Sequence, residues 1–192
     1  MIVTIDRLGH LGHGIAPGPI YVPGTLPGEV VEGTPDGDRL LGRAIAGLQA
    51  TTSDAMSFFA PNLNAYRRFA ANQFVPVNTS WGINNRSVSF RVPMGGGRAR
   101  RIEHRIAGAD ANPYLVMAAM LAGFHHGLAK KLTPTPPSTG NAGEEADPEM
   151  PLRLWTALDR LESSSLMAEY FGPRYPAAYA AIKRSEFEAF MA

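Results

Sequence analysis

The chain contains no cysteine among its 192 residues, which excludes a disulfide framework, a thiolate zinc site and a cysteine nucleophile. It also lacks any run of about 18 apolar residues, so an ordinary transmembrane helix is not expected. The N-terminal sequence MIVTIDRLGH carries Asp6 and has no apolar core of a secretory signal. We therefore expect a cytoplasmic protein, and the 45% hydrophobic content is sufficient for a folded core.

Acidic and basic side chains are concentrated in separate regions of the sequence, although the formal net charge is only +1. Residues 1–42 carry two basic and five acidic side chains, whereas residues 61–105 hold eight arginines and a single acid, Glu103. Arginine stays protonated and binds phosphate or carboxylate through paired hydrogen bonds. The arginine-rich middle of the chain therefore predicts an anion-binding surface.

The pattern of short apolar segments predicts an α+β protein, in which an antiparallel sheet is backed by helices. Short β-rich segments bounded by glycine and proline cover residues 2–5, 19–22 and 29–32. Alternating residues predict two further strands at 87–92 and 101–106. In the second of these, Arg101, Glu103 and Arg105 would share one face of the strand. Either an anion site or a solvated ion-pair ladder fits that triplet.

Helical periodicity predicts four helices. Asn112 and Pro113 fit the N-cap and first position of a helix that extends to Lys130 and Lys131 and is apolar on nearly all faces, so we expect it to be buried. Apolar spacing predicts the other three over residues 40–59, 151–162 and 176–191. Ser163, Ser164 and Ser165 indicate a helix boundary rather than a nucleophile, because we expect no histidine or acid beside them.

Three segments carry a resemblance to a known family. FAPNLNAYRRF (59–69), WGINNRSVSFRVP (81–93) and RRIEHRIAGADANPYLVMAAMLAG (100–123) resemble, in order and spacing, the C-terminal half of the glutamine synthetase catalytic domain. The resemblance covers residues 40–192. It implies part of an antiparallel sheet backed by helices, in a homo-oligomer of two rings whose active sites lie between subunits.

The resemblance also implies a reaction and roles for individual residues. ATP would phosphorylate the γ-carboxylate of glutamate, and ammonia or a larger amine would displace the phosphate. Arg86 would contact the transferred phosphate as the catalytic residue, and Glu103 would be a ligand of Mg²⁺ or Mn²⁺. The remaining roles would fall to arginines: glutamate binding to Arg68, Arg86 and Arg105, and ATP binding to Arg86, Arg91 and Arg101.

Two departures from the family pattern modify this expectation. Ammonia-using members have a glutamate where this chain has Phe74, which resembles the subfamily that joins glutamate to amines such as putrescine; the alternative is that Phe74 only packs in a loop. The family's other metal ligands are not found in residues 1–58, and Mg²⁺ needs several oxygen ligands. We therefore expect this chain alone to be inactive. A non-catalytic anion-binding piece, or one that joins the ring of a complete homologue, is the alternative.

Residues 1–39 resemble the start of a TRAM domain, a small OB-like β-barrel. The resemblance rests on the segments IDRLG (5–9), GHGIA (12–16) and YVPGTLPGE (21–29). TRAM domains bind RNA, so an RNA-associated module is a further alternative. The acidic balance of this segment and its single aromatic residue, Tyr21, argue against RNA binding, which requires a basic and aromatic face.

Overall fold

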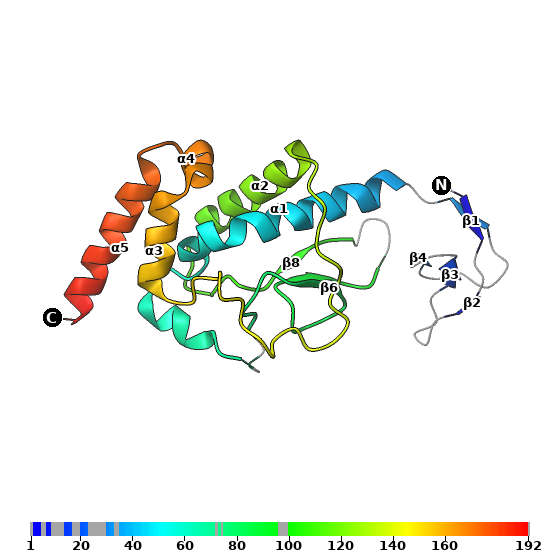
Figure 1. Ribbon diagram of the computed structural model, residues 1–192, viewed down its shortest axis with the longest axis horizontal. Helices are drawn as coiled ribbons and strands as arrows, with labels where there is room; N and C mark the ends of the chain where they lie inside the picture. The colour runs from blue at the N-terminus through cyan, green and yellow to red at the C-terminus, as the bar shows by residue number, and fades with distance from the viewer. Residues whose placement is uncertain are drawn as a thin grey trace.

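The fold is built around two helices that cross the centre of the computed structural model, α1 (Pro35–Phe59) and α2 (Pro113–Ala129) (Figure 1). The structure describes residues 2–4, 7–8, 14–16, 20–22, 30–32, 35–71, 73, 75–95 and 100–191. The fold class is mixed α+β, as predicted. No helix in these ranges combines the length and hydrophobicity needed to cross a membrane.

Helix α2 begins as the sequence predicts. The Asn112 side-chain oxygen accepts hydrogen bonds from the backbone N–H groups of Tyr114 (2.9 Å) and Leu115 (3.4 Å), which would otherwise lack partners. Pro113 occupies the first helical position, where its missing N–H costs nothing. Helix α1 begins at Pro35, five residues before the predicted start, because proline favours that position too.

Glycines allow α1 and α2 to approach until their backbones touch. A Cβ atom added at Gly47 would lie 1.9 Å from the carbonyl oxygen of Gly123 and 2.6 Å from the backbone nitrogen of Gly127. A Cβ atom at Gly127 would lie 1.9 Å from the carbonyl oxygen of Arg43. Any side chain at these positions would therefore force the helices apart. The opposite face of α2 carries exposed apolar side chains, so the expectation that this helix is buried on nearly all faces is wrong for that face.

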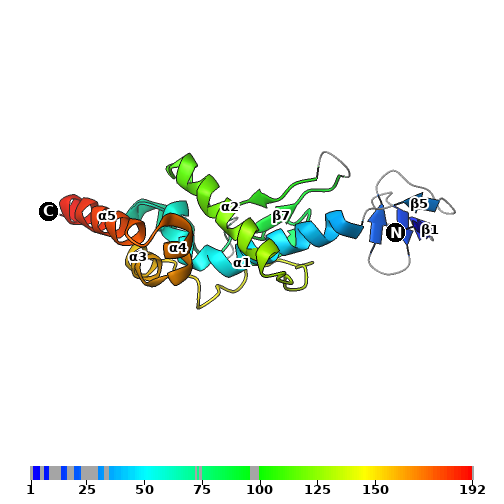
Figure 2. The same ribbon diagram turned by 90° about the horizontal axis from the view of Figure 1, so that it is seen from above.

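Three further helices pack near the C-terminal end of α1: α3 (Leu154–Ser163), α4 (Ser165–Phe171) and α5 (Tyr175–Met191) (Figures 1 and 2). Phe58 of α1 is fully buried among the rings of Phe171 and Tyr179, whose centroids both lie 4.9 Å away. The predicted helices at 151–162 and 176–191 thus exist with slightly shifted ends. Helix α4 was not predicted, because seven residues are too few for a clear helical period.

The sheet has three short strands in the order β6 (Trp81–Ile83), β7 (Phe90–Val92) and β8 (Glu103–His104). Strands β7 and β8 are antiparallel as predicted, but β6 and β7 are parallel, so the expectation of a wholly antiparallel sheet is wrong for this pair. A three-residue strand spans about 10 Å, so the six residues 84–89 are long enough to return the chain to the start of β6. The observed strands β7 and β8 are shorter than the predicted strands at 87–92 and 101–106.

Five strands lie among the described residues of the N-terminal segment. β1 (Ile2–Thr4) pairs antiparallel with β5 (Val30–Glu32), and β2 (Arg7–Leu8), β3 (Gly14–Ala16) and β4 (Ile20–Val22) form an antiparallel sheet. Strand structure at the three predicted segments is therefore confirmed. The OB-like arrangement stays a prediction. The predicted boundary between residues 39 and 40 falls within α1.

We predict that Gly47→Ala destabilises the protein by about 3 kcal/mol, because its methyl group overlaps the α2 backbone. Urea unfolding measures the change. Gly42→Ala on the same helix is the matched control, since its Cβ would meet only the Pro134 ring at 3.7 Å. That variant should be neutral or up to about 1 kcal/mol more stable, because alanine favours helix. Equal stability of the two variants would contradict the close approach of the helices.

Candidate functional site

The single acid of the arginine-rich region, Glu103, lies between two arginines. Its Oε2 atom accepts a hydrogen bond from Nη1 of Arg91 at 2.8 Å, and its Oε1 atom accepts from Nη2 of Arg101 at 2.7 Å. Arg91 is the cross-strand partner of Glu103 in the β7–β8 ladder. Arg101 precedes Glu103 by two residues and lies just before β8, and its contact with Glu103 fits the prediction that the two side chains lie on the same side of the chain.

The two arginines stabilise the ionised form of Glu103. Desolvation raises the pKa of this carboxyl group, but the hydrogen bonds from Arg101 and Arg91 and their positive charges outweigh that effect. The pKa of Glu103 is therefore lower than the usual glutamate value. The group is a carboxylate at neutral pH.

Arg91 is held in place from a second side. Its Nη2 atom donates a hydrogen bond to the side-chain oxygen of Asn84 at 2.6 Å. Asn84 has a φ of 49°, a left-handed conformation that asparagine tolerates better than most residues. Sequence reasoning did not identify Asn84, although the pair Asn84-Asn85 is a turn signal that could have indicated it.

Arg105 and Arg86 belong to the same charged region. Nη1 of Arg105 donates to the carbonyl oxygen of Val88 at 3.0 Å. Desolvation lowers the pKa of Arg105, and the positive charges of Arg91 and Arg86 lower it further, while Glu103 raises it. Arg86 is exposed to solvent. Arg91 and Arg101 thus contact Glu103, and Arg105 lies close enough to Glu103, Arg91 and Arg86 for their charges to interact. These five residues are called the arginine cluster below.

Arg68 occupies a different position. It ends the 3-10 helix η1 (Leu63–Arg68), and its Nη2 atom donates to the carbonyl oxygen of Ile106 at 3.0 Å. Its guanidinium group also lies over the ring of Phe69, 5.0 Å from the centroid. Arg68 thus contacts the backbone just after Arg105, at the edge of the arginine cluster. Phe74 lies outside the described residues, so its predicted role stays a prediction.

His104 faces the opposite side of strand β8. Its ring packs against Phe59 (4.3 Å between centroids) and Phe90 (5.6 Å). Burial lowers the pKa of His104 to about 4, so the ring is neutral at physiological pH. The alternation along β8 thus directs Glu103 to the charged face and anchors the strand in the core through His104.

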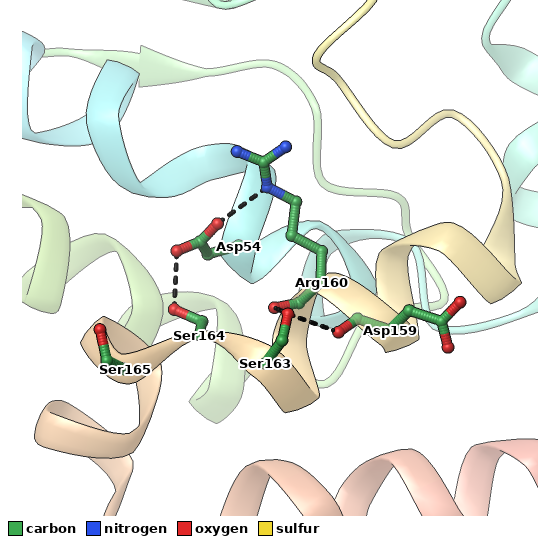
Figure 3. Close-up of a pocket in the computed structure, with 6 residues that line it drawn as sticks. All are labelled: Asp54, Asp159, Arg160, Ser163, Ser164 and Ser165. Atoms are coloured by element: carbon green, nitrogen blue, oxygen red, sulfur yellow. Dashed lines mark hydrogen bonds and ion pairs between the residues drawn. The ribbon is translucent and has the colours of Figure 1, made fainter.

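A shallow pocket of about 520 Å³ lies elsewhere, where α1 meets α3 and α4 (Figure 3). In it, Asp54 accepts hydrogen bonds from Nε of Arg160 (2.9 Å) and from Oγ of Ser164 (2.6 Å). The expectation that no acid lies beside the serines is therefore wrong. Ser164 nevertheless caps α4 by accepting from the N–H of Met167, so the predicted helix boundary is confirmed.

A second cavity of about 310 Å³ lies between η1 and α5 and is lined in part by Asn62, Lys183 and Phe187. Neither cavity is lined by a member of the arginine cluster. The cluster is thus a charged surface of the sheet and not a part of either pocket.

Comparison with known proteins identifies the family. The model of the glutamine synthetase catalytic domain matches residues 32–192, which is most of the chain and includes the whole arginine cluster. The chain belongs to the glutamine synthetase family. The predicted resemblance is thereby confirmed, with a match that begins eight residues before the predicted start at residue 40.

Individual relatives include both amine ligases and glutamine synthetases. The chain is 41% identical to gamma-glutamylputrescine synthetase PuuA of Escherichia coli (strain K12) over 151 residues, which is 79% of this chain and 32% of that protein. It is 34% identical to the glutamine synthetase of Methanocaldococcus jannaschii over 154 residues, or 76% of this chain and 34% of that protein. The chain therefore spans about a third of the length of these relatives.

A solved structure of GmaS without ligand has the same fold. It superposes with a TM-score of 0.66 over 85% of this chain and 39% of that chain, at 24% sequence identity. At this identity the similarity shows the fold alone.

The described residues do not by themselves form a metal site. No group of three or more histidine, aspartate or glutamate side chains in the described part of the chain is placed to hold a metal ion. Glu103 contributes one carboxylate, and both of its oxygens accept hydrogen bonds from arginines. Mg²⁺ usually binds in octahedral geometry to several oxygen ligands, so Glu103 would supply one carboxylate of such a site and the other oxygen ligands would come from elsewhere.

Proposed function

We propose that this chain provides the phosphate- and glutamate-binding arginines of an ATP-dependent ligase that joins glutamate to an amine. The observation that carries this proposal is the convergence of Arg91 and Arg101 on Glu103, with Arg86 and Arg105 close enough for their charges to interact. Four cations around one anion leave an excess of positive charge that a polyphosphate would neutralise. Membership of the glutamine synthetase family supports this assignment.

The arginines would act by position and charge. In phosphoryl transfer the equatorial oxygens of the transferred group carry negative charge, which fixed guanidinium groups stabilise. Arg91 is suited to this task because Asn84 and Glu103 hold its side chain in place before any ligand binds. We assign Arg86, Arg91 and Arg101 to ATP and Arg86 to the transferred phosphate. We assign Arg105 and Arg68 to glutamate; Arg105 precedes Ile106 in the sequence, and Arg68 donates a hydrogen bond to the Ile106 carbonyl oxygen.

We propose Glu103 as one ligand of Mg²⁺ or Mn²⁺, completed by oxygen atoms from outside the described residues. Its lowered pKa supports this role, because a metal ligand must be deprotonated. When the metal binds, Arg91 and Arg101 would donate part of their hydrogen bonds to phosphate oxygens instead of to Glu103.

The amine is proposed to be larger than ammonia. Relatives at 41% identity include gamma-glutamylputrescine synthetase of Escherichia coli and a glutamate–isopropylamine ligase of a Pseudomonas species. The glutamine synthetase of Methanocaldococcus jannaschii is 34% identical. Putrescine and small alkylamines are therefore the first substrates to test, with ammonia for comparison. A ring of subunits, either copies of this chain or a complete homologue, is part of the same proposal.

Replacement of Arg91 or Arg101 by alanine should weaken ATP binding at least about tenfold, since each loses a charge-assisted hydrogen bond to phosphate. Isothermal titration calorimetry at fixed ionic strength measures the affinity. Arg174→Ala, which removes an exposed arginine between α4 and α5, is the matched control and should bind ATP like the unaltered protein. Equal weakening in all three variants would show binding by general positive charge and would contradict the proposed site.

The chain of 192 residues assayed alone should release no ADP when supplied with glutamate, ATP, Mg²⁺ and either putrescine or ammonia. The physical reason is that the part of the chain that the structure describes offers Glu103 at the arginine cluster and no group of three or more possible metal ligands, which leaves a divalent cation short of protein ligands. A coupled assay for ADP measures turnover. ADP release that depends on both glutamate and amine would overturn the expected inactivity while supporting the ligase assignment.

A further inference from the structure

The loop that joins α2 to α3, residues 130–153, contains no helix or strand but lies directly against strand β6 (Figure 1). The indole Nε1 of Trp81 donates a hydrogen bond to the carbonyl oxygen of Thr135 at 2.6 Å, and the N–H of Ser138 donates to the carbonyl oxygen of Trp81 at 2.8 Å. A Cβ atom added at Gly82 would lie only 2.7 Å from the carbonyl oxygen of Ser138. The loop is therefore a fixed neighbour of the sheet at the point where the chain enters the turn after β6.

The turn that carries Arg86 is closed by the side chain of Asn85. The Asn85 Oδ1 atom accepts hydrogen bonds from the backbone N–H of Ser87 at 2.9 Å and from the Ser87 hydroxyl group at 2.7 Å. An asparagine that bonds to the backbone two residues later forms an Asx turn, which restricts the residue between them. Arg86 is that residue, so its backbone is restrained although its side chain is exposed.

The loop holds the same turn from outside. The Asn85 Nδ2 atom donates hydrogen bonds to the carbonyl oxygens of Ser138 at 3.0 Å and Gly140 at 2.8 Å. The N–H of Ala142 donates to the Ser87 hydroxyl oxygen at 2.9 Å. Three hydrogen bonds thus join the loop to the two residues on either side of Arg86. Asn85, Ser87 and residues 138–142 are called the Arg86 clamp.

A restraint on the Arg86 backbone has a physical use at this position. Arg86 lies close enough to Arg105 for their positive charges to repel each other, so an unrestrained side chain would turn away into solvent. An exposed arginine also loses rotamer freedom when it binds an anion. A backbone that is fixed in advance reduces that loss, and the affinity for the anion increases accordingly.

We propose that Asn85 and Ser87 are positioning residues for Arg86, and that the clamp directs its guanidinium group to the same polyanion that Arg91 and Arg101 bind. The inference rests on the proposed function, because it takes ATP as the ligand of Arg86. It adds a role for the loop between α2 and α3, which touches the arginine cluster only through the two neighbours of Arg86 in the bonds described above.

Isothermal titration calorimetry of the full chain with ATP, at fixed ionic strength, tests the clamp. Ser87→Ala removes the hydroxyl group that Ala142 and Asn85 share and should weaken ATP binding at least about threefold. Ser87→Thr retains the hydroxyl group and should bind ATP like the unaltered protein. Thr139→Ala is the matched control, because it removes an exposed hydroxyl group from the same loop without removing a clamp bond.

A double-mutant cycle shows whether Ser87 acts through Arg86. Arg86→Ala should weaken ATP binding by itself, and Ser87→Ala should then cause no further loss in that background. A merely structural role of Ser87 would give the same loss with and without Arg86. Circular dichroism establishes that each variant is folded, and Asn85→Ser, which is too short to reach the loop, replaces Ser87→Ala if that variant unfolds.

The outcomes separate this inference from the proposed function. A loss with Ser87→Ala that disappears in the Arg86→Ala background and is absent in Ser87→Thr supports the clamp. If Arg86→Ala weakens binding but Ser87→Ala does not, or if Ser87→Ala and Ser87→Thr weaken it equally, the clamp is overturned and the proposed function stands. If Arg86→Ala leaves binding unchanged, the assignment of Arg86 to ATP is overturned and the clamp with it.

Discussion

The backbone contact between α1 and α2 is the constraint on which the rest of the structure depends. Gly47 on one helix and Gly123 and Gly127 on the other leave no room for a side chain, so α1 and α2 lie in close contact at these positions. The end of α1 then fixes the segment after strand β8. The carbonyl oxygen of Phe59 accepts from the N–H of Gly108 at 3.0 Å, and the Phe59 ring packs on His104. Glu103 directly precedes His104, so these core contacts also set the position of Glu103.

On this scaffold the strand register assembles the charged site. Antiparallel pairing sets Arg91 opposite Glu103, and the two-residue period of the chain brings Arg101 to the same carboxylate. Glu103 offsets part of the positive charge of the arginine cluster. It also orients the guanidinium groups of Arg91 and Arg101 before any ligand binds. The remaining excess of positive charge is what makes the arginine cluster suited to a polyanion. A passive surface ladder would be expected to alternate charges more evenly.

The sequence predicted the features that depend on local patterns. The N-cap at Asn112, the boundary at Ser164 and the contact between Arg101 and Glu103 all follow from rules over a few neighbouring residues. Local patterns could not predict that β6 and β7 pair in parallel or that Asn84 contacts Arg91. Both features depend on the path that residues 84–89 take between the two strands. The exposed face of α2 was missed for a related reason: composition indicates that a helix should be buried but not what covers it.

If the arginine cluster binds a single polyanion, its guanidinium groups must respond to that ligand together. The side-chain Nε–Hε signals of ¹⁵N-labelled arginines, followed by NMR during titration with ATP, measure this response. We expect the signals of Arg91 and Arg101 to shift together and to saturate at one ATP per chain. Arg160 and Arg184, which are already paired with Asp54 and with Asp159 and Glu162, should stay unchanged. Shifts of similar size in all four arginines, or no shift at Arg91, would contradict the claim.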